Sequence, residues 1–245
     1  MEESIRTLRK WIRESENIVF FGGAGVSTES GIPDFRSEDG LYHQKFDYPA
    51  EEMLSRTFFD SHTEEFFRFY RANTLPGLDT KPNAAHEVLA ALEKAGKVKA
   101  VITQNIDGLH QAAGSEEVLE VHGSIRRNFC RKCHKFFPPE FFRDGEGVPT
   151  CDVCGGVIKP DVVLFEESLD QRTLELAVDY IRAADVLIVG GTSLVVYPAA
   201  GLLRYYRGDR LVLINRDATP YDSRADLVIH DSIGKVLTAA TAQDD

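Results

Sequence analysis

The chain has 245 residues, with 28 lysines and arginines against 39 aspartates and glutamates, which gives a formal net charge of −11. Hydrophobic residues make up 43% and charged residues 27%, so wholesale disorder and collagen-like repeats are excluded. There is no run of about 18 apolar residues and no secretory signal, so we expect a cytoplasmic protein that does not contact the membrane. We also expect a monomer. The acidic charge also argues against direct binding of nucleic acid.

Helices and short apolar strands alternate along most of the chain. Residues 2–15 place apolar side chains at helical spacing, and residues 17–21 form an apolar strand that runs into a glycine loop. Pro82 and Gly96 bracket a second helix, because proline is favoured at the first turn and glycine just past the end. The pattern predicts helices at 2–15, 60–72, 83–95, 169–184 and 198–206, and strands at 17–21, 98–103, 118–121, 185–190, 210–214 and 227–229.

This alternation is typical of an α/β fold in which a parallel sheet is covered by helices on both faces. Residues 124–160 interrupt it, since they contain several prolines and glycines and show little periodicity. All four cysteines of the chain also lie in this region. We therefore expect residues 124–160 to be an excursion from the main domain.

The cysteines form two close pairs, Cys130 with Cys133 and Cys151 with Cys154. This Cys-x2-Cys-x17-Cys-x2-Cys spacing offers four thiolates to one tetrahedral Zn²⁺ ion. A site with four cysteine ligands leaves no position for water or substrate. We therefore predict a structural zinc that stabilises a module too small for its own core, with two redox-active pairs as the alternative.

The glycine loop after the first strand, Gly23-Ala24-Gly25, is a candidate phosphate site. Backbone N–H groups at the start of a helix bind a pyrophosphate, and glycine lets the backbone come close to it. The dinucleotide-binding pattern is incomplete, because Thr28 occupies the position of its third glycine. A tight turn without a ligand is the alternative.

Polar residues also follow two later strands. Gly191-Thr192-Ser193 and Asn215 lie at predicted strand ends, and open parallel sheets bind ligands at the edge where the carboxyl ends of the strands meet. These side chains suit a ribose or a phosphate. Ordinary capping of the strand ends is the alternative.

A third group of polar residues follows two further strands. Residues 104–107, Gln-Asn-Ile-Asp, end one strand, and His122 ends the next. Amides, a carboxylate and an imidazole on one sheet edge can form a catalytic cluster. Imidazole titrates near neutrality, so His122 is a candidate general base, with a structural histidine as the alternative.

The order of these motifs resembles the sirtuin family, the NAD-dependent protein-lysine deacylases. The similarity covers nearly the whole chain, and the short termini resemble the compact catalytic core of bacterial and archaeal members. The motifs that carry it are 23–27 (Gly-Ala-Gly-Val-Ser), 30–36 (Ser-Gly-Ile-Pro-Asp-Phe-Arg), 103–107 (Thr-Gln-Asn-Ile-Asp), His122-Gly123, the four cysteines, 191–193 (Gly-Thr-Ser) and Asn215.

The resemblance implies a Rossmann-like parallel sheet with helices on both faces, a small zinc-ribbon module and a helical insert. Substrates would bind in the cleft between them. By this similarity the Rossmann-like domain comprises residues 1–40, 81–123 and 161–245, the helical insert with the cofactor loop comprises 41–80, and the zinc-ribbon module comprises 124–160.

The resemblance further implies that NAD is a consumed cosubstrate. The acetyl group of acetyl-lysine would pass to ADP-ribose, with release of nicotinamide and 2′-O-acetyl-ADP-ribose. His122 would be the general base, Asn105 would organise the ribose and a water, Asp107 would bond the nicotinamide amide, and the zinc would take no part. The residues implied to contact NAD are Ala24, Gly25, Thr28, Asp34, Phe35, Arg36, Gln104, Asn105, Ile106, Asp107, His122, Gly191, Thr192, Ser193, Asn215, Ser232 and Ile233.

An acetyl-lysine peptide or protein would bind as an added strand between the two domains. Phe67 and Tyr70 stand where members that prefer succinyl groups carry a tyrosine and an arginine, so neutral acyl groups, acetyl first, are expected. Glu166 departs from the pattern, because the family usually has glycine there. The residues implied on the substrate side are Val162, Val163, Phe165, Leu194, Val195, Phe67 and Tyr70.

Three other functions remain as alternatives. A mono-ADP-ribosyltransferase would use the same cosubstrate, but the intact set of Asn105, Asp107 and His122 favours deacylation. A non-catalytic module that recruits acetylated proteins would be expected to have a degenerate pocket. A zinc-ribbon nucleic-acid binder conflicts with the net charge of −11.

Overall fold

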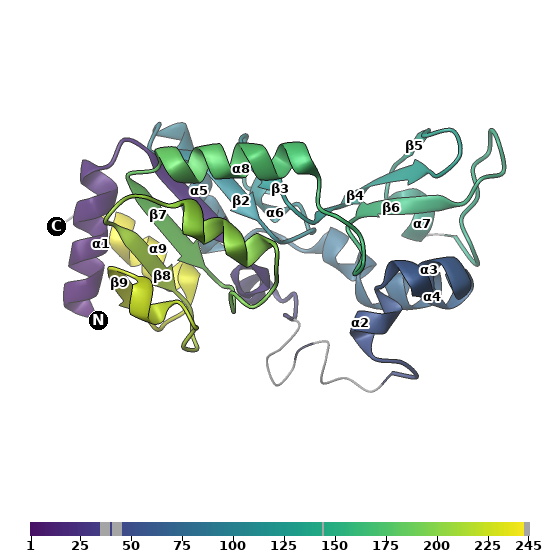
Figure 1. Ribbon diagram of the computed structural model, residues 1–245, viewed down its shortest axis with the longest axis horizontal. Helices are drawn as coiled ribbons and strands as arrows, with labels where there is room; N and C mark the ends of the chain where they lie inside the picture. The colour runs from purple at the N-terminus through teal and green to yellow at the C-terminus, as the bar shows by residue number, and fades with distance from the viewer. Residues whose placement is uncertain (35–39, 41–45, 144, 243–245) are drawn as a thin grey trace.

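The computed structural model describes residues 1–34, 40, 46–143 and 145–242. A six-stranded sheet forms its larger part, in the order β3-β2-β1-β7-β8-β9, with every neighbouring pair parallel (Figure 1). The central strands β1 and β7 are buried along their whole length, as expected for a sheet with helices on both faces. The strands are β1 Ile18–Gly22, β2 Val98–Thr103, β3 Val118–Glu120, β7 Val186–Gly190, β8 Leu211–Ile214 and β9 Leu227–Ile229.

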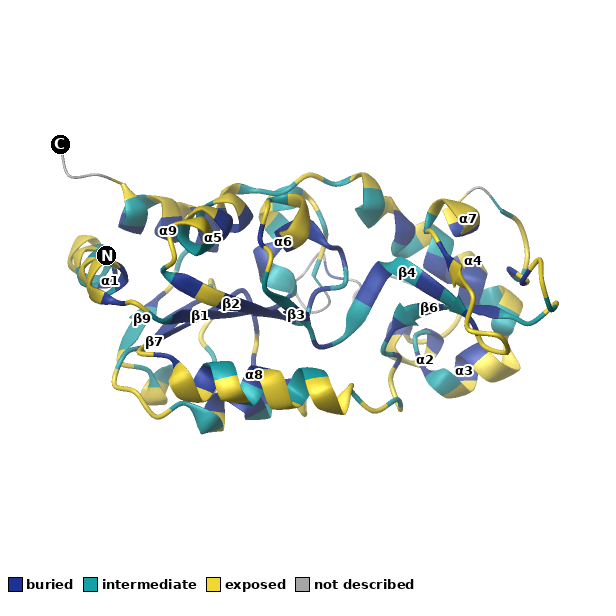
Figure 2. Cartoon of the chain, turned by 90° about the horizontal axis from the view of Figure 1, so that it is seen from above, coloured by how far each residue is buried: buried dark blue, intermediate teal, exposed yellow. Residues whose placement is uncertain are grey.

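Helices cover the two faces of this sheet (Figure 2). On one face α1 (Glu2–Glu14), α5 (Ala84–Lys94) and α9 (Ile233–Thr241) pack against the strands in one hydrophobic cluster. On the other face α8 (Gln171–Ala183) and the 3-10 helix η5 (Ala199–Tyr205) form a second cluster. The structure thus confirms the predicted α/β fold with helices on both faces.

The start of α5 shows how the sequence determines where one of these helices begins. Asn83 precedes the helix, and its side chain accepts a hydrogen bond from the Ala85 N–H at 2.9 Å. His86 Nδ1 in turn accepts from the Asn83 N–H at 3.2 Å, which completes a capping box. Two N–H groups that the helix leaves unpaired are therefore satisfied locally.

Two predicted helices differ in form. The helix expected at 60–72 is two helices, α3 (Arg56–Ser61) and α4 (Thr63–Asn73), because the backbone of His62 between them is not helical, with φ −130° and ψ 49°. The helix expected at 198–206 is the 3-10 helix η5. In both cases the apolar spacing identified the segment, but the spacing does not reveal a local break or a tighter winding.

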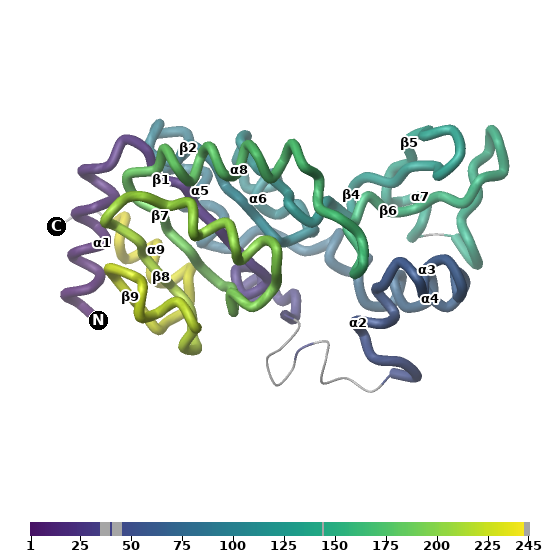
Figure 3. The backbone as a smooth tube through the Cα atoms, in the orientation of Figure 1, coloured from purple at the N-terminus to yellow at the C-terminus, as the bar shows by residue number. Residues whose placement is uncertain are grey.

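A smaller three-stranded sheet, β5-β4-β6, projects from the large one. It consists of β4 (Gly123–Cys130), β5 (Phe136–Phe137) and β6 (Ile158–Val162), all antiparallel. Its side chains share one hydrophobic cluster with α3 and α4, in which aromatic rings predominate. Figure 3 shows both parts together at the end of the molecule away from α1.

The remaining helices are short. α2 (Ala50–Met53) and η4 (Leu75–Asp79) belong to the insert, α6 (Leu109–Ala112) follows β2, and α7 (Glu140–Arg143) lies beside the small sheet. The other 3-10 turns are η1 (Ala24–Val26), η2 (Thr28–Ser30) and η6 (Asp222–Arg224). Among the described residues no helix has the length and apolar character that a bilayer crossing requires.

Candidate active site

The site begins at the end of β1, where the order of the strands in the sheet changes direction. Successive strands β2 and β3 lie to one side of β1, whereas β7, β8 and β9 lie to the other. Ligands of open α/β sheets bind at the carboxyl ends of the strands near such a switch point. The glycine loop that follows β1 is therefore placed where the fold itself favours a ligand.

The loop after β1 packs directly against the loop after β7. The Gly25 N–H donates to the Gly191 carbonyl oxygen at 2.8 Å, and the Gly23 N–H donates to the Gly190 carbonyl oxygen at 3.2 Å. A Cβ atom on Gly25 would lie 2.8 Å from the Gly191 Cα, and Gly191 has a left-handed backbone with φ 60°. The glycines are thus required first for contact between the two loops.

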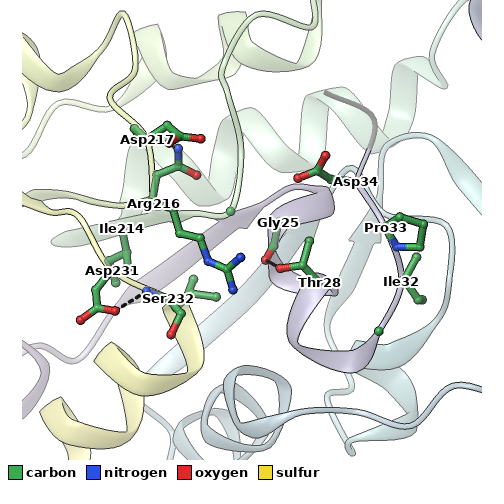
Figure 4. Close-up of a pocket in the computed structure, with 14 residues that line it drawn as sticks. Gly25, Thr28, Ile32, Pro33, Asp34, Ile214, Arg216, Asp217, Asp231 and Ser232 are labelled. Atoms are coloured by element: carbon green, nitrogen blue, oxygen red, sulfur yellow. Dashed lines mark hydrogen bonds between the residues drawn. The ribbon is translucent and has the colours of Figure 1, made fainter. Parts of the chain in front are cut away.

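A cavity of about 320 Å³ opens beside these loops (Figure 4). Seven of its lining residues were predicted as NAD contacts: Gly25, Thr28, Asp34, Gly191, Asn215, Ser232 and Ile233. Seven others were not assigned to the site from the sequence: Gly31, Ile32, Pro33, Ile214, Arg216, Asp217 and Asp231.

Three of the unassigned residues, Arg216, Asp217 and Asp231, bring charge to the cavity. Arg216 directs its guanidinium toward the space between Ser232 and the Gly25 loop, and Asp231 lies beside Ser232 (Figure 4). Asp231 Oδ1 accepts a hydrogen bond from the Ser232 N–H at 2.8 Å. Arg216 follows the predicted Asn215 in the chain, and Asp231 precedes the predicted Ser232. This adjacency is the sequence feature that could have identified them.

A buried hydrogen-bond network joins the end of β2 to the glycine loop. Asn105 Nδ2 donates to Ser27 Oγ at 3.0 Å, and Ser27 Oγ donates to Asp107 Oδ2 at 2.7 Å. Asp107 Oδ1 accepts from the Leu109 N–H at 2.9 Å. Asn105, Asp107 and Ser27 are 8%, 6% and 1% exposed. Ser27 was not predicted as a site residue, although it closes the network between two that were.

His122 contacts Gln104, the residue that precedes Asn105 in the chain. Its Nδ1 is 3.0 Å from the Gln104 carbonyl oxygen. A carbonyl oxygen only accepts, so Nδ1 carries the proton and Nε2 remains a free base. Burial lowers the pKa of His122 below 6.5, although the hydrogen bond to Gln104 acts in the opposite direction. The arrangement therefore keeps the imidazole neutral at physiological pH.

Gln104 also links this group to the neighbouring strand. Its side-chain amide donates to Thr192 Oγ1 at 3.1 Å, which connects the ends of β2 and β7. Thr192 is 9% exposed, whereas Ser193 beside it is exposed. Ala24 and Ile106 are half-buried. Phe35 and Arg36, also predicted as NAD contacts, lie outside the described residues.

The predicted peptide contacts divide into buried and exposed residues. Val162 ends β6 and is 9% exposed, and Val163 follows it half-buried, with its N–H donating to the His122 carbonyl oxygen at 3.0 Å. Phe165 and Val195 are 40% and 47% exposed, whereas Leu194 is 2% exposed and packs in the core. Two exposed apolar side chains therefore come from segments that follow β6 and β7.

Phe67 and Tyr70 lie in the core that the insert shares with the small sheet. They are 0% and 1% exposed. The ring of Phe67 packs against Phe142 at 5.7 Å, and the ring of Tyr70 stacks on Phe66 at 5.6 Å between centroids. Their contact with an acyl group stays a prediction.

The four cysteines converge as the spacing indicates. Their Sγ atoms all lie within 4.8 Å of one another, with Cys130 to Cys154 at 3.4 Å and Cys133 to Cys151 at 3.6 Å. A tetrahedron with zinc–sulfur bonds of ~2.3 Å has edges of about 3.8 Å, so the donor set fits zinc. A Cβ atom on Gly156 would lie 2.9 Å from the Cys130 sulfur, which shows how closely the backbone encloses the cluster.

Comparison with known proteins decides the family. Residues 23–198 match the model of the Sir2 family. The chain belongs to the Sir2 family. An NAD-dependent protein deacetylase of Clostridium acetobutylicum is 61% identical to this chain over 238 residues. The match covers 96% of this chain and 97% of the relative.

Solved Sir2 structures have the same fold as this Sir2 chain. A complex with deacetylated p53 peptide and 3′-O-acetyl ADP-ribose gives a TM-score of 0.89 at 39% identity and covers 96% of each chain. A complex of Sir2 with p53 peptide and NAD⁺ gives a TM-score of 0.84 at 41% identity and covers 95% of each chain.

Proposed function

We propose that the protein is an NAD-dependent protein-lysine deacetylase. It transfers the acetyl group of acetyl-lysine to ADP-ribose and releases nicotinamide and 2′-O-acetyl-ADP-ribose. The observation that carries this function is the convergence at one sheet edge of a neutral imidazole, the Asn105–Ser27–Asp107 network and the glycine loop. The similarity to curated deacetylases supports the same conclusion.

The cavity beside the glycine loop holds the adenosine and diphosphate half of NAD. Thr28, Asn215 and Ser232 offer a hydroxyl or an amide to ribose and phosphate oxygens. Arg216 brings a positive charge toward the loop, which favours the diphosphate (Figure 4). Gly191, Thr192 and the Ile233 turn complete this side of the site.

The other half of the site performs the chemistry. When bound, NAD supplies a ribose carbon made electrophilic by the cationic nicotinamide leaving group. Asp107 and Asn105, both buried and fixed by Ser27, orient the nicotinamide amide and the ribose. His122 accepts a proton at Nε2 from the ribose hydroxyls, while its Nδ1–H donates to the Gln104 carbonyl oxygen.

The acetyl-lysine peptide adds a strand between the segments that follow β6 and β7. Phe165 and Val195 expose apolar side chains there, and main-chain bonds would supply most of the affinity. The acyl preference is for neutral groups. Phe67 and Tyr70 provide no guanidinium for an anionic acyl group, so succinyl peptides should be poor substrates.

The zinc has a structural role. Four sulfurs fill its coordination sphere, so it stabilises residues 124–160 and does not reach the substrate. We assign residues 1–40, 81–123 and 161–245 to the Rossmann-like domain and 41–80 to the insert. We also propose that the protein is cytoplasmic, since the zinc site needs reduced thiols, and that it acts as a monomer and does not bind nucleic acid directly.

The test is deacetylation of an acetyl-lysine peptide with and without NAD. Deacetylation should require NAD and release one nicotinamide for each acetyl group removed. Transfer of radiolabel from NAD to a protein without loss of acetyl would instead indicate an ADP-ribosyltransferase. Peptide binding without turnover would indicate a recruiting module.

A further inference from the structure

The segment that follows β6, residues 163–167, is hydrogen-bonded to two different parts of the molecule. The Val163 N–H donates to the His122 carbonyl oxygen at 3.0 Å, and the Phe165 N–H donates to the Leu54 carbonyl oxygen at 3.0 Å. The Phe165 carbonyl oxygen accepts from the Arg56 N–H at 2.9 Å. The segment therefore connects the candidate general base to the helical insert. We call residues 163–167 the peptide-side segment.

Glu166 is the unusual residue of the peptide-side segment. Its backbone has φ 75°, in the left-handed region that side chains other than glycine rarely adopt. A glycine would take this conformation without strain. A glutamate here therefore carries a backbone strain that glycine would not have. A contact that only the side chain can make would offset this strain.

That contact is with the first turn of α3 in the insert. Glu166 Oε2 accepts from the Thr57 N–H at 2.8 Å and from the Thr57 hydroxyl at 2.7 Å. These two bonds lower the pKa of Glu166 below its usual value, so the carboxylate is ionised at neutral pH. The two residues are 109 positions apart in sequence.

The helix does not need Glu166 for its own start. Ser55 already caps α3, since its hydroxyl accepts from the Phe58 N–H at 3.1 Å. The neighbouring Glu167 adds a separate set of contacts, with Arg56 at 3.1 Å and Lys159 at 3.0 Å. The bonds from Glu166 to Thr57 thus add to the backbone bonds of Phe165 and to the Glu167–Arg56 ion pair, which also join the peptide-side segment to the insert.

We propose that Glu166 is a positioning residue for the protein substrate, which fixes the peptide-side segment against α3 so that the strand-like edge offered to the peptide is formed before binding. This proposal rests on the proposed deacetylase function. When this edge is already ordered, peptide binding does not include the free-energy cost of ordering it. The effect of Glu166 therefore appears in the affinity for the peptide and not in the rate of the chemical step.

The test compares four variants with the wild-type protein in steady-state deacetylation of an acetyl-lysine peptide. Glu166→Gly keeps the backbone conformation and removes both bonds to Thr57. Its KM for the peptide should rise by about three- to tenfold, while kcat and the KM for NAD change by less than about twofold. Glu166→Gln retains an acceptor oxygen and should restore most of the peptide affinity.

Two further variants separate the contact from other effects. Thr57→Val removes only the hydroxyl bond and should give an intermediate rise in the peptide KM. Ser168→Gly is the matched control, because it adds the same backbone freedom two positions away at an exposed residue. It should behave as the wild-type protein does.

Binding of a fluorescent acetyl-lysine peptide, measured by polarisation without NAD, gives the same comparison without turnover. The proposal is overturned if Glu166→Gly binds this peptide within about twofold of the wild type, or if the KM for NAD rises equally. Absence of deacetylation by the wild type would instead reject the proposed function. The binding comparison would still decide the role of Glu166.

Discussion

At the scale of single residues, His122 determines whether the site can work as a base. Its Nδ1 is committed to the Gln104 carbonyl, which leaves Nε2 free, and burial lowers its pKa below 6.5. A base that is neutral over a wider range keeps its activity at lower pH. Both properties follow from the place of His122 between β3 and β4.

Replacing His122 by alanine should lower kcat by roughly 10²- to 10⁴-fold and leave the thermal unfolding temperature nearly unchanged. In the wild-type protein the acid limb of the kcat/KM profile should lie below pH 6.5, because the base is lost only when its lowered pKa is reached. Steady-state kinetics between about pH 5 and 8 measure the change in kcat and the position of the acid limb, and thermal unfolding measures the stability. The exposed His62→Ala is the control. Near-normal turnover by the His122→Ala variant would show that His122 is not the general base.

At the scale of elements, the contact between the loops after β1 and β7 shapes the cavity that we propose for NAD. A Cβ atom on Gly25 would lie 2.8 Å from the Gly191 Cα, within a backbone that cannot move aside easily. Gly25→Ala should therefore separate the loops, weaken NAD binding by at least about tenfold and cost ~1–3 kcal/mol of stability. Calorimetric titration with NAD and thermal unfolding measure these changes.

A glycine in open packing provides the comparison for Gly25. A Cβ atom on Gly201 would meet Tyr197 ring carbons at 3.6 Å, which is ordinary van der Waals contact. Gly201→Ala should bind NAD as the wild type does. Equal NAD affinity in the Gly25 and Gly201 variants would show that the loop contact does not shape the cavity.

The zinc module is the second element whose integrity is testable. Cys130→Ser removes one of four ligands from a cluster whose sulfurs lie within 4.8 Å of one another. The variant should lose its zinc and become sensitive to protease within residues 124–160, since metal binding and folding are coupled in such modules. Metal analysis and limited proteolysis measure this, with Lys132→Ala as the control. A variant with full zinc content and an unchanged cleavage pattern would contradict the assignment.

At the scale of the whole molecule, two buried histidines couple stability to pH. His86 and His110 are 0% and 1% exposed, and their ring centroids are 4.7 Å apart. Burial lowers the pKa of His110 to about 3, with His86 adding to the effect, and burial also lowers the pKa of His86 despite the nearby Asp107. Both rings are therefore neutral in the folded protein across the physiological range.

The sign of this coupling follows from the unfolded chain, in which histidine titrates near pH 6.5. As pH falls below that value, the unfolded state binds protons that the folded state does not, so the free energy of unfolding decreases. The loss is up to ~1.4 kcal/mol per pH unit for each histidine until its folded pKa is reached. His110→Leu should flatten this slope. Urea unfolding between about pH 7 and 4.5 measures it, and identical slopes would contradict the account.

The sequence predicts what depends on short-range pattern. Apolar runs locate the parallel strands, and polar residues shortly after them, such as Asn105 and His122, indicate the candidate site. The cysteine spacing likewise predicts a cluster that closes within one module. In each case the determining residues are neighbours in the chain.

Contacts between distant segments could not be predicted in this way. The bond of Ser27 to Asp107 joins residues 80 positions apart, and that of Glu166 to Thr57 joins residues 109 positions apart. Pattern in one segment gives no information on which side chain of another segment it meets. The local break at His62 was missed for a different reason, because a single residue of non-helical backbone leaves the apolar spacing intact.

The most direct test of the whole account follows the fate of the acetyl group. A peptide that carries isotope-labelled acetyl-lysine is incubated with NAD, and early products are analysed by mass spectrometry. The account predicts that the label appears on ADP-ribose in a one-to-one ratio with released nicotinamide. Labelled acetate that forms while NAD remains intact would contradict it.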